Sequence, residues 1–193
     1  FNQMQVDLKQ YTEELTRTTA ENERIQVEMR LARDVQQGIL PKEFPPYPSA
    51  SSIEIHAHME PAREVGGDYF DFFMIDTHHM GIVVADVSGK GVSAGLFMMV
   101  VRALLRNNAA GNLSPAEAVT RMNMQLAFDN PSTTFVTMFY LVCNLETGEI
   151  TFCNAGHNPP IWLKKNGIQV LASEEGRGTV VGVIEDAVYT DGR

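Results

Sequence analysis

The sequence contains few cysteines, few basic residues and no long apolar run. Its two cysteines, Cys143 and Cys153, are too few for a disulfide framework, so we expect reduced thiols and a cytoplasmic protein. Lysine and arginine number 15 against 24 acidic residues, and the net charge of −9 argues against nucleic acid or an anionic membrane surface as the main partner. No stretch approaches the roughly 20 apolar residues that span a bilayer.

The first part of the chain lacks the residues that break helices. No glycine precedes Gly38 and no proline precedes Pro41, so residues 1–40 are predicted to form one long helix. Its heptad has a positions at Leu8, Leu15, Asn22, Met29 and Gln36 and d positions at Met4, Tyr11, Thr18, Ile25, Ala32 and Ile39. This mostly apolar seam predicts a coiled-coil homodimer whose register Asn22 would fix. The other interpretation is that the helix packs on its own domain.

A proline-rich connector separates this helix from a second region. Four prolines between residues 41 and 50 predict a stiff linker. Residues 51–193 are enough for one domain, and a chain that is 44% hydrophobic can bury a sizeable core. Because the chain opens on Phe1, which is neither a natural initiator nor the start of a signal peptide, we expect a fragment without its upstream part.

Two acidic motifs at glycine turns distinguish the second region. Residues 65–71 read VGGDYFD and residues 86–91 read DVSGKG, and each motif adjoins an apolar run that predicts a buried strand. Both are also compatible with ordinary turns. However, Asp86 directly follows a buried run, and a charge at the end of such a strand needs a partner. Carboxylate oxygens suit Mg²⁺ or Mn²⁺, and glycine lets the backbone approach an ion, so the motifs predict a metal site.

Strands and helices are expected to share the rest of the region. Residues 52–58 alternate as a strand, with His56 and His58 on a solvated face because no third ligand completes a transition-metal site. A helix over residues 92–107 is predicted to bury Leu96, Met99, Val100, Ala103 and Leu104.

Further along, Ser114 is the expected N-cap of a second helix within residues 112–130. A continuously apolar strand over residues 134–143 is expected to turn into a hairpin with residues 150–154. A short strand pair is predicted around residues 165–167.

Four motifs in order resemble one enzyme family. They are GGDYFD at residues 66–71, DVSGKG at 86–91, FVTM at 135–138 and NAGHNPP at 154–160. This set looks like the metal-dependent serine/threonine protein phosphatases of the PPM (2C) type, in their bacterial SpoIIE/RsbU-like branch. The resemblance implies a four-layer α/β/β/α sandwich of two mostly antiparallel sheets, preceded by the coiled-coil helix.

The resemblance also implies a site and a reaction. Asp86 would bridge two Mn²⁺ or Mg²⁺ ions, the Val87 carbonyl would bind one of them, and Asp68 would bind the other side. The implied substrate is phosphoserine or phosphothreonine on an anti-sigma-factor antagonist (STAS) protein, under the control of an upstream sensor. The alternative is a catalytically inactive, phosphatase-like module that binds a partner as a dimer.

Several other polar residues have two interpretations each. Asp71 and Asp76 are expected to be surface groups or groups that support the metal ligands. His157 could act as a general acid, but its position in NAGHNPP favours a turn-stabilising role. Arg63 and Lys90 could meet a phosphate or could be solvated loop charges.

The end of the chain departs from the family pattern. Residues 189–192 read YTDG, as in the segment that supplies a further metal aspartate in the family, but they follow the NAGHNPP motif too closely. We therefore do not carry a metal role onto Asp191. The phosphatase domain over residues 51–193 is expected to be incomplete at its C-terminus.

Overall fold

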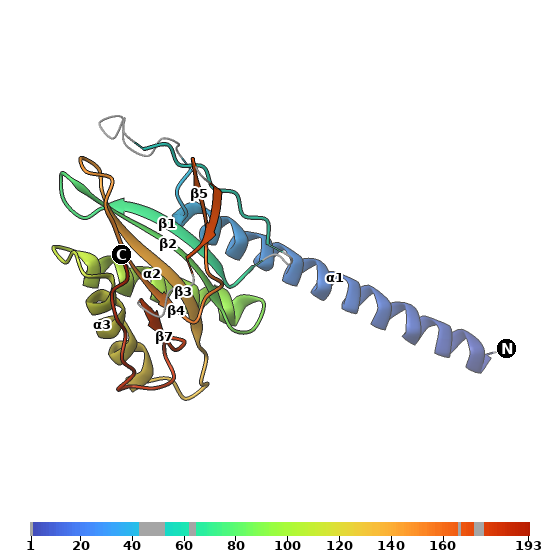
Figure 1. Ribbon diagram of the computed structural model, residues 1–193. Helices are drawn as coiled ribbons and strands as arrows, with labels where there is room; N and C mark the ends of the chain where they lie inside the picture. The colour runs from blue at the N-terminus through green and yellow to red at the C-terminus, as the bar shows by residue number, and fades with distance from the viewer. Residues whose placement is uncertain (1, 43–52, 62–64, 166, 172–175) are drawn as a thin grey trace.

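A computed structural model describes residues 2–42, 53–61, 65–165, 167–171 and 176–193 (Figure 1). The helices are α1 (Asn2–Ile39), α2 (Val92–Ala109) and α3 (Pro115–Phe128). The strands are β1 (Asp68–Met74), β2 (His79–Val87), β3 (Val136–Asn144), β4 (Ile150–Ala155), β5 (Ile161–Lys164), β6 (Gly167–Val170) and β7 (Arg177–Gly178). Residues 43–50 of the connector predicted over residues 41–50 lie outside the described residues.

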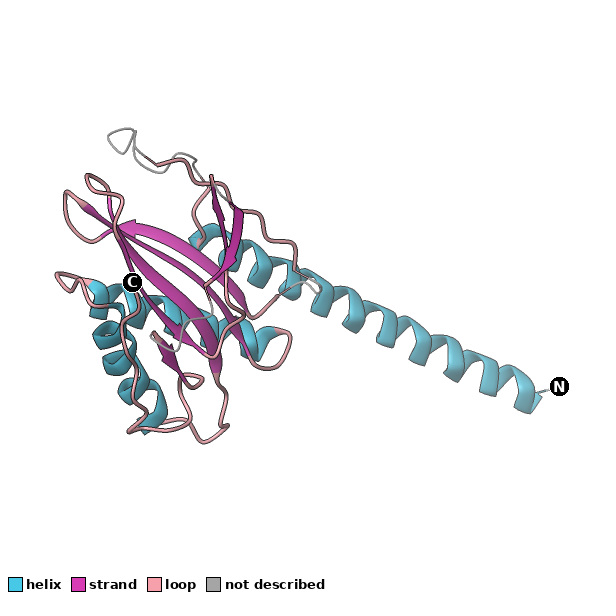
Figure 2. Ribbon diagram, in the orientation of Figure 1, coloured by secondary structure: helices cyan, strands magenta, loops and turns pink. Residues whose placement is uncertain are grey.

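The strands form a five-stranded and a two-stranded sheet. The large sheet has the order β1-β2-β3-β4-β7 and is antiparallel except for the β4–β7 pair, and β5 pairs with β6. Helices α2 and α3 cover one face of the large sheet, and β5–β6 lies on the side of the other face (Figure 2). The predicted α/β class, with two sheets that follow a long helix, is confirmed. Among the described residues, α2 and α3 form one helical layer and the strands form the two sheets.

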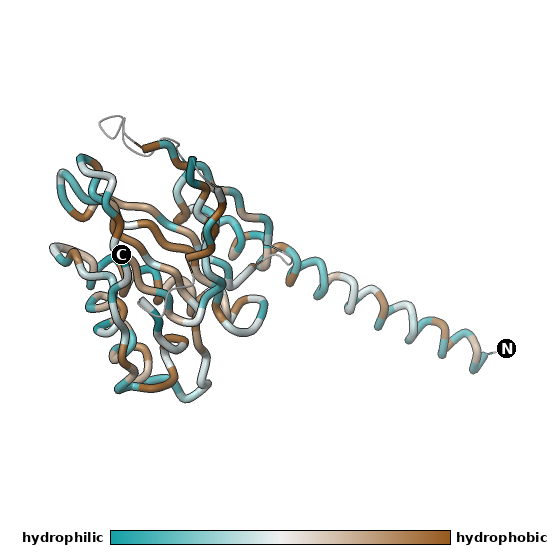
Figure 3. Tube along the Cα trace, in the orientation of Figure 1, coloured by the Kyte–Doolittle hydropathy of each residue, from teal (hydrophilic) through white to brown (hydrophobic). Residues whose placement is uncertain are grey.

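The main core lies between the large sheet and helices α2 and α3. Side chains from alternate strand positions meet the helices there, and the fully buried ones include Tyr69, Val83, Met98, Met122 and Tyr140. The hydrophobic colour in Figure 3 follows the strands of this sheet. Both cysteines are free thiols, as the sequence predicts. The position of the core leaves the opposite sheet face for other contacts.

The buried face of α2 differs from the prediction. Leu96 and Val100 are 56% and 49% exposed, and the helix instead buries Ala94, Met98 and Val101. Apolar residues surround most of this helix, so the sequence spacing fits two faces. The small residues decide the packing, because a side chain on Gly95 would lie 2.3 Å from a methyl group of Val65.

The strand predicted over residues 52–58 is not formed. Residues 53–61 have no assigned strand, and residue 52 lies outside the described part of the chain. The alternation itself is real, because Ile53 and Ile55 pack against Phe72 and Met80 while the residues between them are exposed. The pattern thus reports a segment with one buried side rather than a hydrogen-bonded strand.

Helix α1 extends away from the domain for most of its length (Figure 1). Its predicted seam residues Met4, Leu8, Tyr11 and Leu15 are 53–64% exposed, whereas Gln36 near its end is fully buried. The end of α1 therefore packs on the domain, and dimerisation through the exposed part remains a prediction. Across the described segments, no helix combines the length and apolarity that crossing a membrane requires.

Candidate metal centre

Three polar side chains form a row across neighbouring strands at one end of the large sheet. Asp68 at the start of β1 is the register partner of Asp86 near the end of β2, and Asp86 is the partner of Thr137 on β3. Directly opposed residues in a sheet carry their side chains on the same face. The two aspartates singled out in the sequence are thus neighbours on the face opposite α2 and α3.

Glycine allows the two acidic motifs to approach one another. The Val87 amide donates to the Gly67 carbonyl at 3.3 Å, and a Cβ on Gly67 would lie 2.6 Å from the Val87 carbonyl oxygen. Only glycine fits this contact without a backbone shift. Gly91, at φ +74°, then starts α2 in a conformation that favours glycine.

Burial and like charge act together on this acid pair. Asp86 is exposed on one side, but partial desolvation raises its pKa, the negative charge of Asp68 raises it further, and His157 lowers it. Two carboxylates side by side without a cation repel one another. A divalent cation would remove this repulsion, so the pair fits a hard metal ion.

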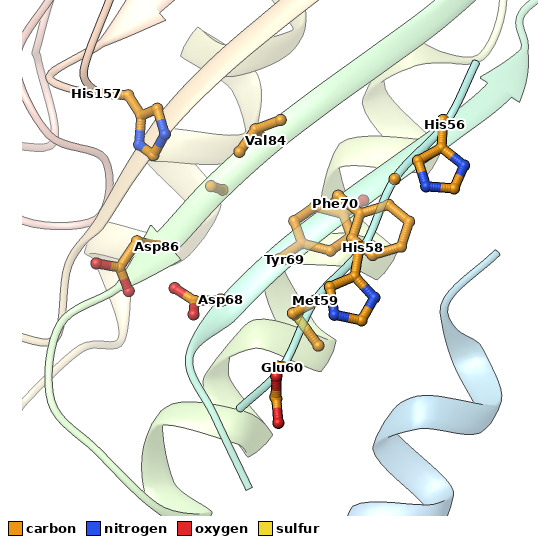
Figure 4. A pocket seen from close by; sticks show the side chains of 12 residues that line it. His56, His58, Met59, Glu60, Asp68, Tyr69, Phe70, Val84, Asp86 and His157 are labelled. Carbon is orange, nitrogen blue, oxygen red and sulfur yellow. The ribbon is translucent and has the colours of Figure 1, made fainter. Parts of the chain in front are cut away.

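Two hollows meet at the acid pair. The larger has a volume of about 630 Å³ and the smaller about 270 Å³, and Asp68 and Asp86 line both. His56 and His58, exposed as predicted, line the larger hollow, and Lys90 lines the smaller one. Figure 4 shows His157 near Asp86, with His56 and His58 on the other side of the larger hollow. Arg63 lies outside the described residues.

The turn at NAGHNPP is held by its main chain and by Asn154. The His157 amide donates to the Asn154 side chain at 2.8 Å, and that side chain donates to the His157 carbonyl at 3.0 Å. The imidazole is separate from this turn, and its Nδ1 lies 2.8 Å from the Thr137 hydroxyl. Burial lowers the pKa of His157, although the negative charges of Asp86 and Asp68 act in the opposite direction.

Asp71 and Asp76 lie in different environments. Asp71 is 1% exposed and pairs with Arg102 and Arg106, so the surface role predicted for it is wrong and it does not line either hollow. Asp76 is exposed in the β1–β2 turn, and the hydrogen bonds that it accepts from the His78 amide and from the ring and amide of His79 lower its pKa. Asp76 is therefore the surface group that the sequence predicts.

Asp191 has a structural role at the start of α3. Its carboxylate accepts hydrogen bonds from the Ser114 hydroxyl at 2.7 Å and from the Ala116 amide at 2.8 Å. Ser114 also caps the helix through the Glu117 amide, as predicted. A carboxylate at a helix N-terminus is stabilising, which accounts for this aspartate without a metal ion.

Sequence reasoning missed one residue that contacts the first acidic motif. The buried Gln36 side chain of α1 donates to the Gly66 carbonyl at 2.6 Å and accepts from the Gly66 amide at 3.1 Å. In the heptad it occupies an a position, where a polar residue marks register, and no motif signals a contact with a loop. This contact connects the long helix to the backbone two residues before Asp68.

The donor set agrees with part of a metal centre. Over the residues that the structure describes, no group of three or more His, Cys, Asp or Glu side chains could hold an ion. Asp68 and Asp86 supply two carboxylates, and hard cations take six or more oxygens from carboxylates, carbonyls and water. The pair therefore fits one side of a Mn²⁺ or Mg²⁺ site.

Comparison with known proteins identifies the fold and the family of the chain. The SiaA-PP2C domain of Pseudomonas aeruginosa is 20% identical to this chain. The two structures superpose over 89% of this chain and 67% of the SiaA-PP2C chain with a TM-score of 0.68, which identifies a PP2C-type fold. A family model described as Stage II sporulation protein E (SpoIIE) matches residues 76–193. That is more than half of the chain, which therefore belongs to the SpoIIE family.

Two other similar proteins carry informative names. Phosphoserine phosphatase RsbU of Bacillus subtilis is 28% identical over 165 residues, which cover 86% of this chain and 48% of RsbU. The chain thus spans about half the length of this relative. RsbX, solved in complex with magnesium, is 20% identical to this chain. The two structures superpose over 68% of this chain and 62% of the RsbX chain, with a TM-score of 0.51.

Proposed function

We propose that the protein is a metal-dependent phosphatase that removes phosphate from phosphoserine or phosphothreonine of a regulatory protein in the cytoplasm. The observation that carries this proposal is the opposed pair of Asp68 and Asp86 beside a hollow of about 630 Å³. Membership of the SpoIIE family and the similarity to a phosphoserine phosphatase support it.

In this proposal each residue of the site has a task. Asp86 and Asp68 hold Mn²⁺ or Mg²⁺, two ions in the complete domain, and the Val87 carbonyl supplies a further oxygen ligand. Metal ions at such a site lower the pKa of bound water and neutralise charge on the transferred phosphoryl group. Lys90, which lines the adjoining hollow, would attract the phosphate. A covalent cysteine route is disfavoured because burial raises the pKa of both thiols.

The substrate that fits best is a phosphorylated protein of the STAS type. The family resemblance leads to this substrate, and the name of RsbU agrees with phosphoserine. The hollow at the acid pair is open enough for a phosphorylated segment of a folded partner, because Asp68 and Asp86 are both exposed.

The experiment is hydrolysis of a phosphoserine STAS protein and of p-nitrophenyl phosphate, with Mn²⁺ and with a chelator. It uses the 193-residue chain and a form extended at the C-terminus. We expect metal-dependent release of phosphate from both substrates. If neither form releases phosphate although both bind the STAS protein, the partner-binding module becomes the correct interpretation, which the small number of described ligands favours.

We further infer that the protein forms a homodimer through α1, and that an upstream sensor acts on the domain through this helix. The exposed heptad residues would form the dimer seam, and the Gln36 contact would transmit a change in α1 to the loop before Asp68. The last turns of α1 pack on the domain, and the Gln36 contact would give a movement of the helix a direct route to that loop.

Two variants of α1 should separate assembly from transmission. We expect Leu15→Lys to convert a dimer into a monomer in sedimentation velocity, because it places a charge in the apolar seam. Arg17→Ala, a matched exposed change outside the seam, should remain dimeric. Gln36→Ala should also remain dimeric but should lose about 1–3 kcal/mol of stability and part of its activity, because Gly66 keeps two unpaired polar groups. A wild-type chain that sediments as a monomer would contradict the dimer.

A further inference from the structure

We propose that the imidazole of His157 is the proton donor to the serine oxygen that leaves phosphorus, and that Thr137 positions it. The inference rests on the phosphatase function proposed above and deepens it. It assigns a catalytic role to a residue whose place in the sequence motif suggests a turn.

The turn does not need the ring. Asn154 holds the turn through two hydrogen bonds to the main chain of His157, so any residue with a backbone N–H at position 157 could satisfy both. The imidazole is thus available for another task. It lies against the hollow instead of being enclosed in the core, since His157 is half-buried and lines the same hollow as Asp68 and Asp86.

Thr137 fixes which ring nitrogen can reach a substrate. Its hydroxyl bonds Nδ1 of His157 at 2.8 Å and lies 3.4 Å from the Asp86 carbonyl oxygen. Thr137 is also the register partner of Asp86. The hydrogen bond to Thr137 therefore holds the imidazole beside the strand position next to the acid pair. With Nδ1 engaged, Nε2 is the nitrogen left to meet a phosphate ester at Asp86.

The other titratable groups around the larger hollow are less well placed. His56, His58 and Glu60 lie across the hollow from His157 (Figure 4). Tyr69 is 1% exposed and donates its hydroxyl proton to Asp71. Asp68 and Asp86 are the proposed metal ligands. Among the described residues of this hollow, His157 is therefore the proton donor on the side of Asp86.

The step balances as an ordinary hydrolysis. Water forms the new bond to phosphorus while the bond between phosphorus and the serine oxygen breaks. The donor is the imidazolium form of His157: its Nε2 proton goes to the serine oxygen, which leaves as a neutral hydroxyl group, and the ring becomes neutral. The proton lost by the attacking water restores the ring, so the protein ends unchanged.

The leaving group provides the test. A serine alkoxide is a poor leaving group without a proton, whereas p-nitrophenolate leaves as a stable anion. In the form that is active in the assay above, His157→Gln should lower kcat on a phosphoserine peptide by about 10²–10⁴-fold. Its rate on p-nitrophenyl phosphate should stay within about threefold of wild type, since only the proton-dependent reaction loses its donor. Thr137→Val should show a smaller loss of the same selective kind.

Controls separate this proposal from a structural role and from failure of the proposed function. His78→Gln, on an exposed histidine that pairs with Glu146 in a distant turn, should leave both rates unchanged. Equal losses on both substrates for His157→Gln, with an unchanged thermal unfolding curve, would assign the ring to substrate or metal binding and overturn the proposal. So would an unchanged rate on the phosphoserine peptide. A wild type without Mn²⁺-dependent activity on either substrate would instead reject the phosphatase itself.

Discussion

The Asp86→Asn variant is expected to lose Mn²⁺-dependent hydrolysis by at least about 10³-fold, because charge stabilisation by a bound metal ion contributes several kcal/mol to the transition state. Asn keeps the size of the side chain and removes its charge, so the change tests the ligand and not the packing. Phosphate release from p-nitrophenyl phosphate measures the rate, and isothermal titration with Mn²⁺ measures the affinity. Both should fall together.

Stability should move in the opposite direction. Burial and the charge of Asp68 both raise the pKa of Asp86, so the ionised form of Asp86 is disfavoured in the folded state. At neutral pH without metal, removing that charge should leave the thermal midpoint equal to or above that of wild type. Asp129→Asn, at the exposed C-cap of α3, is the matched control and should change neither rate nor affinity. A variant that retains Mn²⁺-dependent turnover would remove Asp86 from the site.

The position of this acid pair could be predicted because local chemistry determines it. Glycine turns and a carboxylate directly after an apolar run have few structural solutions, and the sheet register then places Asp68 opposite Asp86. The hairpins and the cap at Ser114 are predictable for the same reason, since each depends on a few adjacent residues.

Features that depend on distant partners could not be predicted. The apolar residues of α2 fit two faces, and the observed face brings Gly95 so close to Val65, a residue distant in the sequence, that an added Cβ would lie 2.3 Å from its methyl group. The roles of Gln36 and Asp191 likewise depend on residues far away in the sequence, Gly66 and Ser114. Asp71 was expected at the surface or in support of the metal ligands, but successive strand residues alternate between faces. An odd separation places Asp71 on the helix side, away from Asp68.

The burial of Asp71 leads to the largest expected effect on stability. Its side chain is fully buried, accepts from Nε and Nη2 of Arg106 at 2.6 and 2.7 Å, and lies 3.2 Å from Arg102. The Tyr69 hydroxyl and the Phe72 amide also donate to it, at 3.1 and 3.0 Å. Asp71→Ala would remove the buried carboxylate that all these groups contact, so we expect a loss of about 3–5 kcal/mol in the free energy of unfolding.

Urea denaturation measures this loss, and a surface pair provides the comparison. Glu117→Ala breaks the exposed contact between Glu117 and Arg121 and should cost less than about 1 kcal/mol. If Asp71→Ala cost no more than Glu117→Ala, solvent would be compensating the two arginines, which are 22% and 38% exposed.

The triple variant Asp71→Leu with Arg102→Met and Arg106→Met should recover part of the loss, because it also removes both charges that pair with Asp71, while the Tyr69 hydroxyl still loses its acceptor. Recovery would show that the penalty comes from the charges left without partners. Asp71 lies on the same strand as Asp68, but its carboxylate lies on the opposite face from the acid pair. The recovered variant should therefore regain Mn²⁺-dependent activity together with stability, and stability without activity would mean that the ion pair also positions β1 for the site.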